Sequence, residues 1–284
     1  MNKKEIAELK LQGYLQQQDQ EYFSVRVISN AGTMTAVQMI RIAEISQKYG
    51  RGNMGFTSRM CVEIPWIKYE DIEAVKKEME DAGLCTGGTG LKVEPIVACK
   101  GTVCSYGLID TQDLCRKLHE KHFEKDLPAK FKIGVVGCPN NCVKAPINDL
   151  GFMGQRIPMV LEDKCKGCQL CLRDCPVKAI EKVGNIVQVD YDKCIHCGRC
   201  IRVCPFKAMA AEKEGVAVFI GGKFGRKHRI GDRIDNIFSL EDAERIADKV
   251  IAYYNEKGNP GERLGNTIDR IGLENVRRAV FGEE

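Results

Sequence analysis

The stretch Lys164–Ile180 reads KCKGCQLCLRDCPVKAI, and Lys193–Met209 reads KCIHCGRCIRVCPFKAM. Each contains the spacing C-x2-C-x2-C-x3-C-P, and the second copy lies 29 positions after the first. One tight loop can turn three thiolates of this spacing inward, whereas the fourth, followed by proline, is led away toward the other copy. The spacing is typical of two [4Fe–4S] clusters that exchange their fourth ligands. The repeat therefore predicts a small iron–sulfur unit in the middle of the chain.

The exchange of fourth ligands divides the eight cysteines of the repeat into two sets. One set is Cys165, Cys168, Cys171 and Cys204, and the other is Cys194, Cys197, Cys200 and Cys175. Structural zinc sites use separated C-x2-C pairs, so triplets with a trailing Cys-Pro disfavour zinc. The segment resembles a bacterial two-cluster ferredoxin, which implies that it carries electrons.

Upstream of the repeat, four more cysteines form two pairs. The pairs are Cys99 with Cys104 in ACKGTVC, and Cys138 with Cys142 in GCPNNC. A helical pattern over 110–123 and a short strand over 131–136 separate them. Two such pairs can surround one [4Fe–4S] cluster or a tetrahedral zinc ion, and the neighbouring repeat favours the cluster. Three cysteines without a pattern are expected to be small buried side chains: Cys61, Cys85 and Cys115.

The composition is that of a globular protein. Of the 284 residues, 44% are hydrophobic and 29% charged, and the net charge is +4. This charge is too small to indicate a nucleic-acid partner. No apolar run approaches the roughly 18 residues of a membrane span, and the start MNKKEIAELK lacks the apolar core of a signal peptide. We therefore expect a cytoplasmic protein whose cysteines remain thiols.

GCPNNC after a strand, with CKGTVC upstream, resembles the cluster-binding signature of the sirohaem-dependent sulfite and nitrite reductase family. In that family the four cysteines hold a [4Fe–4S] cluster, and the last also bridges to the sirohaem iron. The resemblance implies this bridging role for Cys142. The family usually has five residues between the first two cysteines, and here Lys100 to Val103 makes four.

The N-terminal part shows strand patterns over 22–29 and 55–64, and helix patterns over 35–49 and 69–82. This β-α-β-α unit resembles the ferredoxin-like half domain of the same family, in which each matching strand carries an arginine. Those arginines are Arg26 and Arg59. The family's K-x-K segment before the second cysteine pair is matched by Lys130 and Lys132, which we expect to share one face of a strand.

These four basic residues suit the chemistry of a small oxyanion. Arginine offers a fixed fork of donors. Lysine offers mobile donors that can also transfer protons. The resemblance implies that the four hold and protonate the substrate. The alternative is that they are exposed strand residues or edge charges without a function.

The glycine-rich segment GGKFGRKHR follows at 221–229. Sirohaem bears eight carboxylates, and the family has a similar GGK-type segment, so we expect four side chains here to bind its rim. They are Lys223, Arg226, Lys227 and Arg229. The alternative is a solvated basic loop. The pattern over 239–254 predicts a helix capped by Ser239.

We expect an α+β fold in three parts. A ferredoxin-like half domain spans 1–90, a sirohaem/[4Fe–4S] α/β domain spans 91–162 and 215–284, and a two-cluster ferredoxin insert spans 163–214. The chain most resembles the small, single-unit dissimilatory-type sulfite reductases and the C subunit of anaerobic sulfite reductases. Larger family members contain two copies of the unit. A single copy should therefore pair with itself or with a related subunit.

The resemblance implies the six-electron reduction of sulfite to sulfide, with sirohaem and three [4Fe–4S] clusters. Electrons would enter through the ferredoxin clusters, pass to the third cluster and cross Cys142 to the sirohaem. Nitrite reduction to ammonia is the close alternative, and an iron–sulfur electron-relay subunit without sirohaem is another. No G-x-G-x-x-G fingerprint follows a strand, so we expect an external electron-donor protein or reductase subunit.

Overall fold

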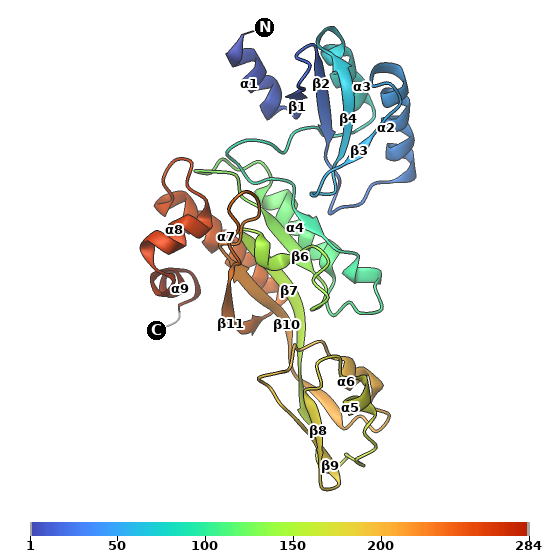
Figure 1. The fold of residues 1–284 in the computed structure, drawn as a ribbon, viewed down its shortest axis with the longest axis vertical. Helices are drawn as coiled ribbons and strands as arrows, with labels where there is room; N and C mark the ends of the chain where they lie inside the picture. The colour runs from blue at the N-terminus through green and yellow to red at the C-terminus, as the bar shows by residue number, and fades with distance from the viewer. Residues whose placement is uncertain (1, 283–284) are drawn as a thin grey trace.

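The computed structural model describes residues 2–282 and has the predicted α+β fold (Figure 1). A four-stranded antiparallel sheet of order β1-β2-β4-β3 forms the N-terminal unit. Its elements are α1 (Lys3–Leu11), β1 (Tyr14–Gln16), β2 (Tyr22–Val27), α2 (Ala36–Tyr49), β3 (Gly55–Phe56), β4 (Val62–Lys68), the 3-10 turn η1 (Tyr69–Asp71) and α3 (Ile72–Asp81).

Local sequence accounts for most of these boundaries. In β2, half-buried and buried positions alternate, so that Phe23, Val25 and Val27 enter the core. The helix expected over 35–49 is confirmed as α2, which begins after the Thr35 cap. The strand expected over 55–64 is wrong in one respect: a turn over 57–61 interrupts it. Arg59 therefore lies on this turn and not on a strand.

A five-stranded sheet of order β11-β10-β7-β6-β5 forms the second unit. Strands β5, β6 and β7 are parallel, and β10 and β11 continue the sheet antiparallel. The elements are β5 (Val97–Ala98), η2 (Gly101–Val103), α4 (Thr111–His122), β6 (Ile133–Val136), η3 (Ala145–Ile147), β7 (Leu150–Val160), β10 (Met209–Ile220), β11 (Asp232–Phe238), α7 (Leu240–Lys257), α8 (Leu264–Ile271) and α9 (Leu273–Phe281).

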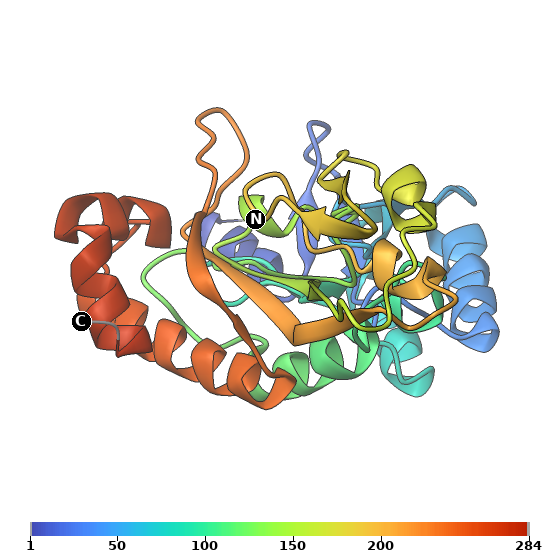
Figure 2. The ribbon, with the colours of Figure 1, turned by 90° about the horizontal axis from the view of Figure 1, so that it is seen from below.

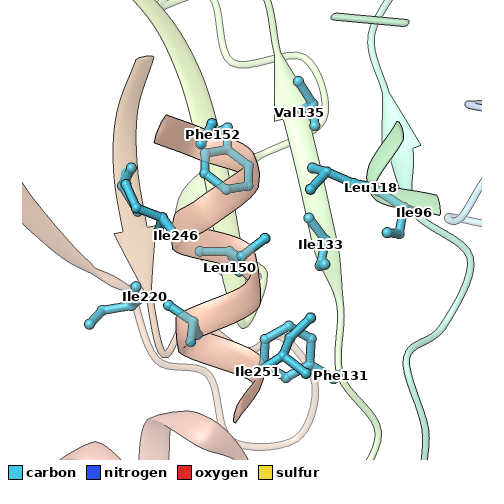
Figure 3. Close-up of a cluster of buried hydrophobic side chains, with 14 of the residues drawn as sticks. Ile96, Leu118, Phe131, Ile133, Val135, Leu150, Phe152, Ile220, Ile246 and Ile251 are labelled. Atoms are coloured by element: carbon cyan, nitrogen blue, oxygen red, sulfur yellow. The ribbon is translucent and has the colours of Figure 1, made fainter. Parts of the chain in front are cut away.

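Helices α4 and α7 cover one face of this sheet, and the largest hydrophobic core lies between them and the strands (Figure 3). Ile133 and Phe152 of the sheet pack in the same cluster as Leu118 of α4 and Ile246 of α7. Burial of this much apolar area is the main term that stabilises the unit. The core fixes β5 and β6 side by side, and the loops after them carry the paired cysteines.

Between β7 and β10 the chain forms α5 (Leu170–Asp174), β8 (Ile180–Val183), β9 (Ile186–Val189) and α6 (Arg199–Val203). This segment lies at the opposite end of the molecule from the N-terminal unit (Figure 1). The sequence repeat is also a backbone repeat: Gln169 and Gly198, 29 positions apart, have φ of 64° and 65°. Long strands β7 and β10 join the segment to the sheet, and β10 begins at Met209, before the expected boundary at 215.

The loop over 221–231 joins β10 to β11 and projects from the body of the protein, where Figure 2 shows it in orange. Of the helices in residues 2–282, none has the length and apolar character needed to cross a membrane.

Candidate functional site

The four paired cysteines line one hollow of about 350 Å³, which we name the cysteine hollow. They are Cys99, Cys104, Cys138 and Cys142. Cys99 directly follows β5, and Cys138 lies two residues after β6. Because these strands are parallel, their carboxyl ends share one edge of the sheet, which is where open α/β sheets place their ligands. The sheet thus gathers the pairs that the sequence separates.

Glycines allow the loops of the cysteine hollow to approach closely. A Cβ on Gly107 would lie 1.9 Å from the Gly101 carbonyl oxygen, and a Cβ on Gly137 would lie 2.9 Å from the Gly101 Cα. No side chain fits at either position. The Gly137 N–H donates a hydrogen bond of 3.2 Å to the Cys99 sulfur. The backbone is therefore shaped to present sulfur atoms to the hollow.

The thiols of the cysteine hollow are electrostatically coupled. Burial raises the pKa of the Cys138 thiol, and the negative charges of Cys99, Cys142 and Cys104 raise it further. A cationic cluster would remove this repulsion and favour the thiolates. Across residues 2–282 no three His, Cys, Asp or Glu side chains converge as the ligands of a single ion do. The four sulfurs line a wider space, and the donor set fits a [4Fe–4S] cluster.

In the repeated segment, several cysteines lie close enough to affect one another's pKa. Burial raises the pKa of Cys171, and the nearby charges of Cys204 and Cys168 add to the effect. Burial raises the pKa of Cys194 likewise, with Cys197 and Cys175 as its charged neighbours. Backbone N–H groups also repeat: Ala179 donates to the Cys175 sulfur at 3.2 Å, and Ala208 donates to the Cys204 sulfur at 3.3 Å.

A second hollow of about 430 Å³ lies between this segment and the cysteine hollow, and Cys138 and Cys197 both line it. The segment is held here by Arg202, which donates to the Ser105 carbonyl at 2.7 Å. The backbone N–H of Arg156 in β7 donates to the His196 carbonyl at 2.8 Å. The set that contains Cys197 is therefore adjacent to the loop that carries Cys138.

The four predicted basic residues also meet in one place, a hollow of about 580 Å³ that we name the basic hollow. Those residues are Arg26, Arg59, Lys130 and Lys132. Lys130 and Lys132 precede β6 and do not lie on a strand, contrary to the expectation, although both line the same hollow. The hollow gathers residues from the N-terminal unit and from the second unit.

The basic side chains differ in their burial and in the hydrogen bonds and ion pairs that they form. Arg59 is 9% exposed, and its guanidinium donates to the carbonyls of Pro95 and Ile133 and to the side chain of Asn148. It therefore anchors the turn over 57–61 to the second unit.

Arg26 pairs with Glu63 at 2.8 Å, and Lys132 Nζ lies 3.4 Å from Glu94 Oε2. Burial lowers the pKa of the Lys132 ammonium, which Glu94 partly opposes. Lys130 is exposed. Both lysines and Arg26 line the hollow.

Three charged residues of the basic hollow were missed in the sequence: Lys10, Glu94 and Arg263. Arg263 donates to both oxygens of the fully buried Asp149, whose Oδ2 also accepts the Lys132 backbone N–H at 2.8 Å. No local motif marks these positions, because each joins the hollow only through the packing of distant segments.

Within residues 2–282, no residue lines both the cysteine hollow and the basic hollow. The cysteines follow the carboxyl ends of β5 and β6, whereas Glu94 and Lys132 precede their amino ends. The two hollows therefore open at opposite ends of these strands.

The four candidate residues of the loop over 221–231 differ in their contacts. Arg229 donates to Asp232 and Asp269, and Lys223 donates to Asn266 at 2.5 Å, so both brace the loop. Arg226 and Lys227 are exposed, and neither has an ion pair in the part of the chain that the structure describes.

Of the three cysteines without a pattern, Cys61 and Cys115 are buried, as expected. Cys85 is exposed, so the expectation was wrong for this residue.

Two family models match the chain. The model described as nitrite and sulphite reductase 4Fe-4S domain matches residues 90–284, and the model described as nitrite/sulfite reductase ferredoxin-like half domain matches residues 14–82. Together they span both units of the fold.

Among curated proteins, the chain is 37% identical over 273 residues to the coenzyme F420-dependent sulfite reductase of Methanocaldococcus jannaschii. The match covers 93% of this chain and 44% of that protein, so the chain spans less than half of this relative's length. It is 31% identical over 173 residues to the C subunit of the anaerobic sulfite reductase of Salmonella typhimurium, covering 55% of this chain and 50% of the relative.

The crystal structure of dissimilatory sulfite reductase I superposes with a TM-score of 0.75 at 19% identity, covering 93% of this chain and 70% of that chain. At this identity the likeness shows the fold alone.

Proposed function

Because this chain belongs to the nitrite and sulphite reductase family, we propose that it reduces sulfite to sulfide in a six-electron reaction. One observation carries the proposal: the fold builds a hollow lined by four thiols and a separate hollow lined by cationic side chains. The first suits an iron–sulfur cluster and the second suits a small oxyanion. An electron relay needs only the first.

The cofactors proposed are sirohaem and three [4Fe–4S] clusters. When bound, they supply the electrons and the open iron position for the reduction. The cysteine hollow would hold one cluster, and the exposed Cys142 would provide the bridging thiolate. The crossed sets of the segment between β7 and β10 would hold the other two. Arg226 and Lys227 are the loop residues free to meet sirohaem carboxylates.

The residues of the basic hollow bind and protonate the substrate. Arg26 and Lys130 balance the charge of sulfite, since positive groups fixed in place stabilise an anion without reorganisation. Lys132 donates one of the two protons with which a sulfite oxygen leaves as water, solvent supplies the other, and the external donor protein supplies the two electrons. Arg59 holds the turn over 57–61 in position through its carbonyl contacts.

The site is proposed to form between two chains, which are copies of this chain or related subunits. Its support is that the two hollows open at opposite ends of β5 and β6, so that a basic hollow of one chain could face a cysteine hollow of its partner. A fully active monomer would contradict this arrangement.

A complementation experiment tests the shared site. One chain carries Cys138→Ser and the other carries Lys130→Gln with Lys132→Gln, and each should be inactive alone. Co-expression should recover part of the activity, because a mixed dimer contains one complete site. If each site lay within one chain, the mixture would remain inactive.

Electrons are proposed to enter at the segment between β7 and β10 from an external donor protein. Cys197 lines the hollow beside Cys138, whereas Cys168 is exposed and is not among the residues of that hollow. The set that contains Cys168 is therefore the outer one, at which a donor would arrive.

The first experiment is a visible spectrum of the anaerobically purified protein, with acid–acetone extraction of tetrapyrrole and an iron count. We expect sirohaem and about twelve cluster irons per chain, four for each cluster. Cluster absorption without extractable sirohaem would indicate an electron-relay subunit instead. The ratio of kcat/KM for sulfite and nitrite then decides between sulfide and ammonia formation, since the family description names both substrates.

A further inference from the structure

Glu94 is a buried carboxylate in a hollow that otherwise collects positive charge. It is 8% exposed, and its Oε2 lies 3.4 Å from Lys132 Nζ. Of the described residues that line the basic hollow, it is the one with an acidic side chain. A buried charge without a partner is costly, so this placement requires a cation beside it.

The backbone fixes Glu94 and Lys132 next to each other. Val93 and Phe131 form a parallel bridge, the Glu94 N–H donates to the Phe131 carbonyl at 2.8 Å, and the Phe131 N–H donates to the Lys92 carbonyl at 2.9 Å. Lys132 is fixed further by its own N–H, which donates to Asp149. The pair therefore results from strand-like register and not from the chance meeting of two mobile side chains.

We propose that Glu94 is a positioning residue that holds Lys132 as a protonated ammonium group directed into the basic hollow. This role rests on the proposed function, because it concerns the lysine that donates protons to the leaving oxygen of sulfite. Once the ammonium has given up its proton, Lys132 is a neutral amine, and the carboxylate favours its reprotonation from solvent.

The cations that face Lys132 oppose the ammonium form. Arg59 approaches from the turn over 57–61, Lys130 from the same segment, and Arg263 from the start of α8. Asp149 is the remaining acidic neighbour, and both of its oxygens accept from Arg263. Together with burial, the cations lower the pKa of Lys132, and Glu94 raises it. Without Glu94, no acidic side chain equally close to the Lys132 ammonium would favour its protonated form.

Competitive labelling of Lys132 measures this directly and does not depend on turnover. The full chain is acetylated across a range of pH, and mass spectrometry gives the pH at which half of the Lys132 amine reacts. In Glu94→Gln the pH of half-reaction should fall by about 1–3 pH units, because the variant loses an opposite charge a few ångströms from the amine. In Glu94→Asp, which keeps the charge, most of the fall should be reversed.

Glu70→Gln is the matched control, because Glu70 is an exposed carboxylate whose ion-pair partner is Lys68. It should leave the labelling of Lys132 unchanged. Equal midpoints in the wild type and Glu94→Gln would overturn the proposal. If Glu94→Gln does not fold, the wild-type protein still provides a test of the proposal. Lys132 of the wild type must resist labelling at pH 7. If Lys132 reacts as a neutral amine at pH 7, the proposal is refuted.

In the holoenzyme, the pH profile of kcat gives a second readout. The ammonium is the active form, so activity falls above the pKa of Lys132, and this fall should move to lower pH in Glu94→Gln and back in Glu94→Asp. A purely structural Glu94 would lower kcat at every pH alike, which contradicts the proposal. The labelling result does not depend on sulfite reduction. The proposed role of Glu94 and the proposed reduction of sulfite can therefore be refuted independently of each other.

Discussion

Arg202 of α6 donates a 2.7 Å hydrogen bond to the Ser105 carbonyl, and its guanidinium lies 5.3 Å from the centroid of the Tyr106 ring. These contacts join two cysteine-containing regions that are nearly 100 positions apart in the sequence. Ser105 directly follows Cys104, and Arg202 lies two residues before Cys204. One side chain therefore helps to hold the repeated segment against the cysteine hollow.

Replacement of Arg202 by glutamine should loosen this junction. A hydrogen bond of this kind contributes about 1 kcal/mol, which is roughly a fivefold change in a local opening equilibrium. Hydrogen exchange of the amides in 101–108 and 194–204 should accelerate accordingly. The control is Arg173→Gln, an exposed arginine in the same segment. Equal exchange in the two variants would show that Arg202 does not hold the junction.

The pair between Arg263 and Asp149 should be costly to break. Asp149 is fully buried and Arg263 is 13% exposed, so Arg263→Met leaves an uncompensated buried carboxylate. We expect a loss of about 3–5 kcal/mol in the free energy of unfolding, measured by urea denaturation. Arg41→Gln breaks an exposed pair with Glu44 and should cost at most about 1 kcal/mol. Similar losses in both variants would show that burial does not determine the cost of breaking the ion pair.

Replacement of Cys138 by serine should remove one cluster. Iron content should fall from about twelve to about eight atoms per chain, since each cluster of this kind holds four. The exposed Cys85 serves as the control, and Cys85→Ser should keep the full iron content. An unchanged iron count in Cys138→Ser would remove Cys138 from the ligand set.

Gly107→Ala should distort the cysteine hollow. The added Cβ would meet the Gly101 carbonyl at 1.9 Å, so the loop that carries Cys104 must shift. We expect reduced iron content after reconstitution with iron and sulfide. Gly55→Ala is the control, because the nearest atom to its new Cβ is 4.0 Å away. If both alanine variants bind iron like the wild type, the close approach is not needed.

His122 should make stability dependent on pH. Burial and the nearby Lys125 ammonium lower its pKa to about 4, whereas an unfolded histidine titrates near pH 6.5. Between these values the unfolded chain binds a proton that the native chain does not. The free energy of unfolding therefore falls as the pH drops from about 6.5 to about 4.

Urea midpoints at pH 7 and pH 5 measure this effect. In His122→Gln the difference between the two midpoints should shrink, whereas His228→Gln, in the exposed loop, should keep the wild-type difference. An undiminished pH dependence in His122→Gln would assign it to other groups.

The sequence by itself determined the features that arise within a few residues. The C-x2-C-x2-C-x3-C-P spacing sets how one loop turns its thiols, and the structure repeats the same backbone conformation at Gln169 and Gly198. Thr35 begins α2 as expected, because a cap depends only on the first turn of its helix. The positions that match the reductase signature also pointed to the four basic residues that line one hollow.

Only the tertiary structure decided how those residues are used. It turns Arg59 inward to carbonyl groups, places Glu94 beside Lys132, and brings Arg263 to Asp149 across 114 positions. Local spacing cannot specify such pairs, because they depend on how separate strands and loops pack around a common core. Burial then makes the electrostatic interaction between these charges stronger than it would be in water.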